Sequence, residues 1–246
     1  MEEIMNQTSS NKKAIEKNRK RICKIESDIK TNESLIFQSR SMIEENRLMI
    51  LSNYTAAFLG NRQLAKTNTD EVFENRELIL EKIDPNNEVE TNFVSVHKNK
   101  AKLDRLTHNS EINSKVLEVS KEMSEINLKL VGINTKIMEL NQSIVDFNTQ
   151  QIETNKELIS GKLQVSEATP EKNSELINSN ENQMIELEKN LRNNREKMHD
   201  LISVSEDYSN SVMESKNMIF SRRESIMKNK ETIQINRSKI IFNPKS

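Results

Sequence analysis

Few side chains in this sequence could carry out acid–base or metal chemistry. The histidines, His97, His108 and His199, occur in no HExxH pattern and in no cluster with cysteine, so the usual spacing of a zinc site is missing. Glu196 and His199 have the Glu-x-x-His spacing of di-metal helical bundles, but one such pair cannot build a two-metal site. With three glycines in all, a glycine-rich phosphate loop is also not expected. The sequence therefore predicts no enzyme, no metal site and no cofactor.

The chemistry that the sequence does offer is amide hydrogen bonding, repeated every seven residues. In the first third, isoleucines fall seven apart, and asparagine follows four of them by three residues. The same seven-residue repeat recurs as a row of asparagines in the middle third and as asparagines after isoleucines in the last third. The predicted ladder comprises Asn18, Asn32, Asn46, Asn53, Asn127, Asn134, Asn141, Asn148, Asn155, Asn229 and Asn236.

A sustained seven-residue period predicts helices that wind around partner helices. At about 103° per residue, the middle asparagine row falls between two apolar rows, so it lies inside the apolar face. Buried amides need hydrogen-bond partners, and facing amides on neighbouring helices could satisfy one another and fix the axial alignment. We therefore expect a buried or half-buried ladder. The alternative is that the amides lie at the edge of the seam and contact water.

The elements that must position these amides are three long helices. We expect helices at about 11–83, 92–165 and 172–241, with turns near Pro85 and Pro170, because proline disfavours helix in its own and the preceding position. Short turns join neighbouring helices antiparallel. The predicted fold is all-α: an up-down-up, three-helix antiparallel coiled-coil bundle with a recurrent asparagine seam. We expect it to be one elongated rod-like domain over residues 1–246.

Charge supports this order of helices. Residues 11–30 carry eight basic and three acidic side chains, whereas residues 167–190 carry two and six. Residues 66–84 carry three and six, whereas residues 214–240 carry seven and three. The first and last helices therefore have complementary charges when they lie parallel, which helps to set their register. Surplus apolar rows on the middle helix predict that it is the central one, with neighbours on two sides.

The seven-residue repeat shifts by one residue near position 55. Phe58, Ala65, Val72 and Ile79 continue the isoleucine series one residue late. An extra residue of this kind alters the supercoil locally or is absorbed as a π-bulge. Tyr54, Phe58 and Gly60 could form a docking notch there. The alternative is a purely geometric correction.

Composition limits the remaining function classes. The net charge of −1 gives little repulsion between copies and no basic excess, so nucleic acid is an unlikely partner. The single Cys23 allows no internal disulfide. No apolar run approaches the ~20 residues of a membrane span, and the N-terminus lacks the apolar core of a secretory signal, so we expect a cytoplasmic location.

The leading expectation is a non-enzymatic structural protein that self-associates into filaments or a larger assembly. One alternative is a rigid spacer or adaptor that binds partner proteins along its length. Another is a bundle that holds ions or a small ligand between asparagine layers. The sequence leaves open whether the helices pack within one chain or between chains.

Overall fold

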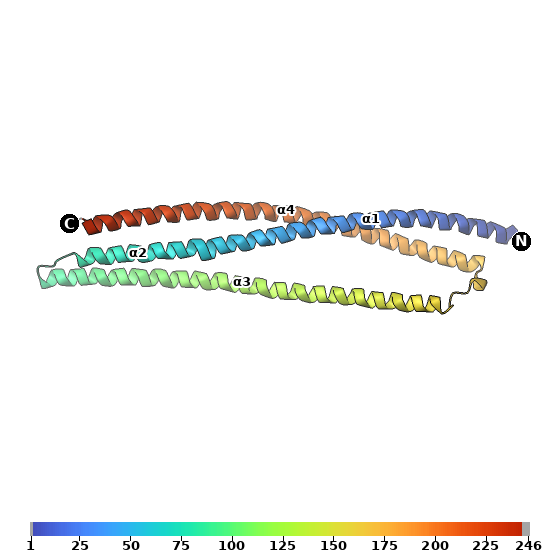
Figure 1. Cartoon of the computed structure of the whole chain (residues 1–246), viewed down its shortest axis with the longest axis horizontal. Helices are drawn as coiled ribbons and strands as arrows, with labels where there is room; N and C mark the ends of the chain where they lie inside the picture. Colours follow the sequence, from blue (N-terminus) through green and yellow to red (C-terminus); the bar gives the residue numbers. More distant parts are fainter. Residues whose placement is uncertain (1, 243–246) are drawn as a thin grey trace. The chain divides into compact units, whose positions relative to one another are not determined.

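The computed structural model describes residues 2–242, and within them every regular element is helical (Figure 1). This confirms the all-α fold. The three predicted helical stretches are present, and the first is divided by a seven-residue π-helix. In chain order the elements are α1 (Glu2–Tyr54), the π-helix η1 (Thr55–Asn61), α2 (Arg62–Glu81), α3 (Glu88–Ile159), the 3₁₀ turn η2 (Val165–Glu167) and α4 (Pro170–Phe242).

The first turn, around Pro85, ends in a capping box. The Asn87 side chain accepts a hydrogen bond from the backbone N–H of Glu90 at 2.9 Å, and the Glu90 carboxylate accepts one from the backbone N–H of Asn86 at 2.7 Å. The Asn86 bond lowers the pKa of Glu90. Because this cap satisfies one free N–H group of the first helical turn, α3 begins at Glu88 rather than near residue 92.

The second turn lies before Pro170, because Pro170 is the first residue of α4. Proline suits this position, where its missing N–H would have no helical partner. The preceding helix ends at Ile159, not near 165, in a Schellman motif. Gly161 adopts φ +81°, its N–H donates to Leu158, and the N–H of Lys162 donates to Glu157. A glycine is favoured at this left-handed position because it has no Cβ.

Contacts divide the chain into two compact units. Unit 1 comprises Met1–Leu59 and Leu163–Ser221, and unit 2 comprises Gly60–Lys162 and Arg222–Ser246. The expectation of a single domain stays a prediction. In unit 1, α1 runs parallel to the first part of α4, since Asn11 bonds to Pro170 and Asn53 bonds to Val212.

Unit 2 contains α2, α3 and the last part of α4. There α2 runs parallel to α4 and forms a hairpin with α3, so α2 lies between the two (Figure 1). Arg105 of α3 donates to Asp70 of α2 at 2.8 Å, and Arg76 of α2 donates to Asp104 of α3 at 3.2 Å. The prediction that the middle helix is central is therefore wrong in unit 2. One face of α2 carries asparagines to α4, and another face carries charged side chains to α3.

Candidate functional site

The asparagines of α1 form a one-sided ladder against the backbone of α4. In unit 1 each Nδ2 donates to the carbonyl oxygen of the residue 159 positions later in the chain. The five bonds are Asn11 to Pro170 (2.8 Å), Asn18 to Ile177 (3.3 Å), Asn32 to Leu191 (3.1 Å), Asn46 to Ser205 (2.7 Å) and Asn53 to Val212 (2.9 Å). Because successive bonds lie one or two heptads apart on both helices, the ladder fixes the axial register of the two helices.

The α4 row opposite the ladder is mostly apolar. Ile177, Met184, Leu191 and Met198 are buried there. Two positions in the α1 row are not asparagine. Ile25 is 4% exposed and packs with Met184 and Leu191, and Ser39 is buried one heptad beyond Asn32. This row therefore accepts an aliphatic side chain, and asparagine there is not required to fill space.

The ladder continues in unit 2 with a register that differs by one residue. Asn68 donates to Ile226 at 2.8 Å and Asn75 donates to Ile233 at 3.1 Å, now 158 positions apart. At the next heptad Lys82 donates through Nζ to the carbonyl of Ile240. The change from 159 to 158 equals the extra residue in the sequence, and the π-helix η1 holds that residue.

The hydrogen-bond partners differ from those expected. Facing amides were predicted, but the partners of the α1 and α2 amides are backbone carbonyls, because the opposite row of α4 carries apolar side chains. Asn18, Asn32 and Asn46 are buried and Asn53 is half-buried. Asn229 and Asn236 of α4 are exposed, because each follows the buried or half-buried isoleucine of that row by three residues and so projects beside the seam.

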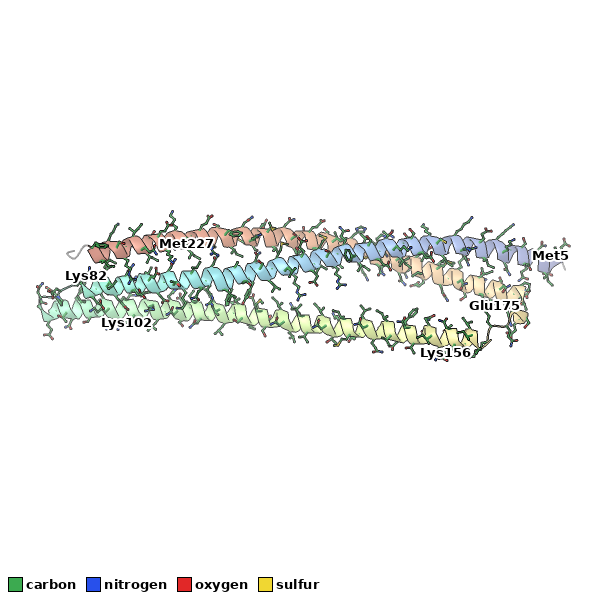
Figure 2. The ribbon with its side chains drawn as sticks, viewed as in Figure 1. Met5, Lys82, Lys102, Lys156, Glu175 and Met227 are labelled. Atoms are coloured by element: carbon green, nitrogen blue, oxygen red, sulfur yellow. The ribbon has the colours of Figure 1, made fainter. Side chains whose placement is uncertain are left out.

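The middle asparagine row has a different environment. Asn127, Asn134, Asn141, Asn148 and Asn155 are all exposed on α3. So are most members of the apolar rows on either side of them: Ile137 is 48%, Val131 60% and Met138 63% exposed. Side chains project from α3 along its length between Lys102 and Lys156 (Figure 2). The buried residues of α3 are Val94 and Ala101, near its start. Among the described residues of unit 2, none of the other helices buries this row.

Charged side chains line one edge of the parallel pair in unit 1, which we call the ion-pair edge. Arg21 binds Glu188 through two bonds of 2.6 and 2.8 Å, and Lys17 donates to Glu181 at 2.9 Å. These bonds lower the pKa of both glutamates, and the bond to Glu188 raises the pKa of Arg21. The contacts join the basic 11–30 segment to the acidic 167–190 segment, as their charges predicted.

Arg195 links the ion-pair edge to the ladder. It donates through Nη2 to Asp28 at 2.9 Å and through Nε to Oδ1 of Asn32 at 3.2 Å. Both polar ends of the buried Asn32 amide are therefore bonded. In unit 2 the pair Arg237 and Glu74, at 2.9 Å, likewise joins the basic end of α4 to the acidic stretch of α2.

The opposite edge of the parallel pair in unit 1 is apolar, and we call it the isoleucine edge. It is formed on α1 by the row four residues after the ladder and on α4 by the row three residues after the buried one. Its members are Ile15, Ile22, Ile29, Ile36, Ile43 and Ile50 of α1 with Leu187, Leu201 and Tyr208 of α4. Asn180 and Asn194 interrupt the α4 row. Except for Ile29, which is partly buried against Ile25 and its neighbours, the members are 40–61% exposed.

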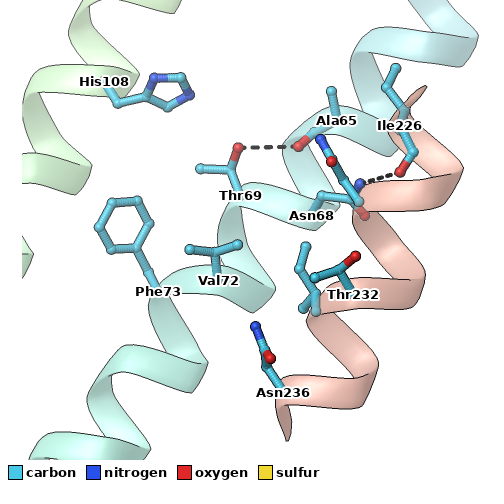
Figure 3. Close-up of a pocket in the computed structure, with 11 residues that line it drawn as sticks. Ala65, Asn68, Thr69, Val72, Phe73, His108, Ile226, Thr232 and Asn236 are labelled. Atoms are coloured by element: carbon cyan, nitrogen blue, oxygen red, sulfur yellow. Dashed lines mark hydrogen bonds between the residues drawn. The ribbon is translucent and has the colours of Figure 1, made fainter. Parts of the chain in front are cut away.

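Unit 2 contains an open cavity of about 610 Å³ beside its part of the ladder (Figure 3). Asn68 crosses to α4 on one side of it, and His108 of α3 and Phe73 of α2 lie on the other. A second hollow of about 440 Å³ extends between α2 and α3 as far as Ile112. The lining of the larger cavity is apolar, amide and hydroxyl, with a single imidazole, so it offers contact surface rather than a reactive group.

The residues of the predicted notch lie at the end of α1 and in the π-helix η1. The rings of Tyr54 and Phe58 stack with centroids 5.3 Å apart and planes 12° apart. The space around Gly60 is open, since no atom would lie within 4 Å of an added Cβ. Docking of a partner at this segment stays a prediction.

No groups typical of metal or membrane sites occur in residues 2–242. No three histidine, cysteine or acidic side chains there gather closely enough to hold a metal ion. None of the helices in this range combines the length and apolar character needed to cross a bilayer. Comparisons of the chain with protein-family models, with curated proteins and with solved structures found no match.

Sequence reasoning missed two rungs of the ladder, Asn11 and Lys82. Asn11 bonds to α4 in the same way as the predicted residues, and its signal was the seven-residue phase, which extends back from Asn18. Asn68 and Asn75, which keep step with the series after the one-residue slip, also bond to α4. Lys82 carried no such signal, because it replaces an amide by an ammonium group on a long side chain.

Proposed function

We propose that this chain is a non-enzymatic structural coiled-coil protein that self-associates. The observation that supports the proposal is the apolar surface of α3. Between Ile112 and Ile152, side chains that recur every seven residues are exposed along one broad face of the helix, apart from the half-buried Val116 and Met123. The most regular row is Ile112, Val119, Ile126, Ile133, Leu140 and Phe147, and the second is Val116, Met123, Leu130, Ile137 and Ile144.

Exposure of this surface to water is costly. Covering a large aliphatic side chain completely is worth ~1.5–3 kcal/mol, and the two rows hold many half-exposed ones. Contiguous apolar patches of more than a few hundred Å² mark interaction surfaces on soluble proteins. A patch with a seven-residue period fits another helix with the same period. A second copy supplies such helices, and a net charge of −1 opposes association only weakly.

The polar features of the chain support the same function. The ladder and the ion-pair edge hold α1 and α4 in one register, which suits a stiff structural element. We place the protein in the cytoplasm, where its one cysteine, the exposed Cys23, is kept reduced.

Light scattering after gel filtration tests this proposal. From about 1 to 100 µM, the micromolar affinity range, the measured mass should rise above the 28.6 kDa of one chain. The variant Ile126→Lys, Ile133→Lys, Leu140→Lys should remain at one chain's mass. A control with three lysines in a polar row, Thr135→Lys, Gln142→Lys, Thr149→Lys, should associate like the natural chain. If the natural chain keeps the mass of one copy throughout, the proposal fails. Association of the natural chain that requires an added protein would indicate an adaptor instead.

A further inference from the structure

The isoleucine edge of unit 1 is a second apolar surface with the same period as α3. Its place follows from the ion pairs. Arg21 lies three residues after a ladder position and bonds to Glu188, which lies four residues after the buried Met184. In a parallel pair, rows at +3 on one helix and +4 on the other therefore share an edge. The isoleucines at +4 on α1 and Leu187 and Leu201 at +3 on α4 must then share the opposite edge.

This edge is left uncovered in unit 1. Ile15 is 52%, Ile36 54% and Ile50 51% exposed on α1, and Leu201 is 48% exposed on α4. The ion-pair edge is more covered except at Lys17, which keeps 69% of its side-chain surface, since Arg21 keeps 22% and Glu188 27%. The parallel pair thus covers its charged edge better than its apolar one, which is the reverse of what burial in water favours.

We propose that the isoleucine edge binds residues 112–147 of α3 from a second copy of the chain. The two surfaces match in length and period. The isoleucine row has six positions from Ile15 to Ile50, and the main α3 row has six positions from Ile112 to Phe147. Each spans 36 residues with a seven-residue step. This inference rests on the proposed self-association and names the surfaces that make it.

The area is sufficient for a stable contact. Complete burial of an aliphatic side chain removes roughly 60–120 Å² of apolar surface from water. The two surfaces together hold about twenty such side chains, most near half exposure, so one contact covers on the order of 900 Å² of apolar area. Stable interfaces bury ~1,200–2,000 Å² in total, of which somewhat more than half is apolar.

The contact joins two different surfaces, and this determines the forms of assembly. If each of two copies binds the other's α3 with its isoleucine edge, the contact forms twice and the result is a closed dimer. Made in one direction only, it leaves a free α3 face and a free isoleucine edge, and it extends into a filament. In both cases a copy that lacks one of the two surfaces retains the other.

Complementation between two variants tests the pairing. The edge variant Ile36→Lys, Ile43→Lys keeps α3 intact, and the α3 variant Ile126→Lys, Ile133→Lys, Leu140→Lys keeps the edge intact. Each alone should associate on the order of 100-fold more weakly than the natural chain, because each 1.4 kcal/mol is a factor of ten. An equimolar mixture should form a 1:1 complex through the one contact that remains. Ser34→Lys, Ser41→Lys, on another face of α1, is the control for the edge variant.

The outcomes separate the two proposals. If the natural chain associates but the edge variant associates equally well, or if the mixture yields no complex, the isoleucine edge is not the surface that binds α3. Self-association itself would then still stand. A natural chain that never associates overturns both.

A measurement on the natural chain requires no substitution and no assumption about folding. The exposed Cys23, next to Ile22, carries a maleimide-linked benzophenone, and labelled chains are mixed with isotopically heavy chains before irradiation. The proposal predicts cross-links from Cys23 to heavy peptides within residues 112–147. Cross-links to heavy peptides of α1 or α4, or cross-links confined to the labelled chain's own peptides, would overturn it.

Discussion

Two helices of this chain carry asparagine every seven residues, and their asparagines have opposite environments. On α1 the amides are buried and donate to α4, whereas on α3 the row from Asn127 to Asn155 is exposed. Both rows lie beside apolar rows, so the pattern on a helix does not itself decide burial. In unit 1, α1 has a parallel neighbour that presents carbonyl oxygens at the same spacing, whereas no described helix of unit 2 does this for the α3 row.

The partner explains why the α1 amides are tolerated in a seam. A helix carbonyl already bonded within its helix has a second lone pair, and the short asparagine side chain reaches it from the neighbouring helix. Each rung replaces apolar contact with a hydrogen bond worth ~0.5–1.5 kcal/mol net. The gain is alignment, since a rung forms only when the two helices are in register.

Placing carboxylates in the two rows should give the largest difference between them. Asn18→Asp, Asn32→Asp, Asn46→Asp directs three carboxylates at carbonyl oxygens that need donors. Losing such a bond and burying an unpaired acceptor costs ~1–3 kcal/mol per site or more, so the triple variant should lose several kcal/mol of unfolding free energy. Asn127→Asp, Asn134→Asp, Asn141→Asp should lose less than about 0.5 kcal/mol per site at dilution, as exposed substitutions do.

Urea unfolding followed by circular dichroism measures both variants at a concentration where the chain is a single copy. Equal losses in the two variants would mean that the α1 and α3 rows have the same environment. That result would contradict the contrast between them.

Replacing amides by isoleucine should have an intermediate effect of opposite sign. Ile25 shows that the row accepts isoleucine. Asn18→Ile, Asn32→Ile should therefore gain ~1.5–3 kcal/mol of burial per site and lose ~0.5–1.5 kcal/mol of hydrogen bonding, leaving a net gain of about 1 kcal/mol each. Asn32 has the smaller expected gain, because its Oδ1 also accepts from Arg195.

The matching change on α3, Asn134→Ile, should give no gain in a dilute single copy. Thermal unfolding of the Asn18→Ile, Asn32→Ile and Asn134→Ile variants, each compared with the natural chain, measures these changes. If both α1 variants are less stable than the natural chain, the hydrogen bonds of the rungs stabilise the helix pair by more than the apolar burial that replaces them.

Acid should have the smallest effect, and it should act on α1 and α4. The pKa values of Glu181 and Glu188 are lowered by hydrogen bonds from Lys17 and Arg21. A carboxylate whose pKa is lowered by folding stabilises the fold above its unfolded pKa, near 4.5 for glutamate, and loses that contribution as pH falls through the folded value. The melting temperature should therefore fall slightly below about pH 4.5.

Glu188→Gln should reduce this acid-dependent fall, because it removes one of the titrating partners. Glu186→Gln, at an exposed site on the same helix, is the control and should leave the fall unchanged. A fall of the same size in both variants would assign the acid sensitivity to other carboxylates.

The sequence predicted the fold well where local chemistry sets it. The helices, the turn at Pro85 and the extra residue near position 55 all have local signals. The end of α3 at Ile159 was missed because Gly161 was not recognised as a left-handed cap. Opposite charges placed residues 11–30 beside residues 167–190, and the pair of Arg21 with Glu188 forms there.

The site was predicted less completely, for a physical reason. Every residue has a carbonyl oxygen, so a sequence pattern cannot show that Asn32 pairs with the backbone of Leu191 rather than with another amide. Apolar rows on α3 show that a face needs a partner, but they do not identify that partner. The burial of Asn134 depends on that partner, so the sequence pattern could not predict it.

The register of α1 against α4 supports the whole account, and an engineered disulfide measures it directly. Ser39 and Met198 are both buried and 159 positions apart, as are the bonded pairs on either side of them. With Cys23 changed to serine, Ser39→Cys, Met198→Cys should form a disulfide within one chain in mild oxidant, since facing positions bring the two Cα atoms within the required ~4.4–6.8 Å. Ser39→Cys, Ser205→Cys, one heptad out of register, should not. Equal yields, or a higher yield for the shifted pair, would contradict the ladder.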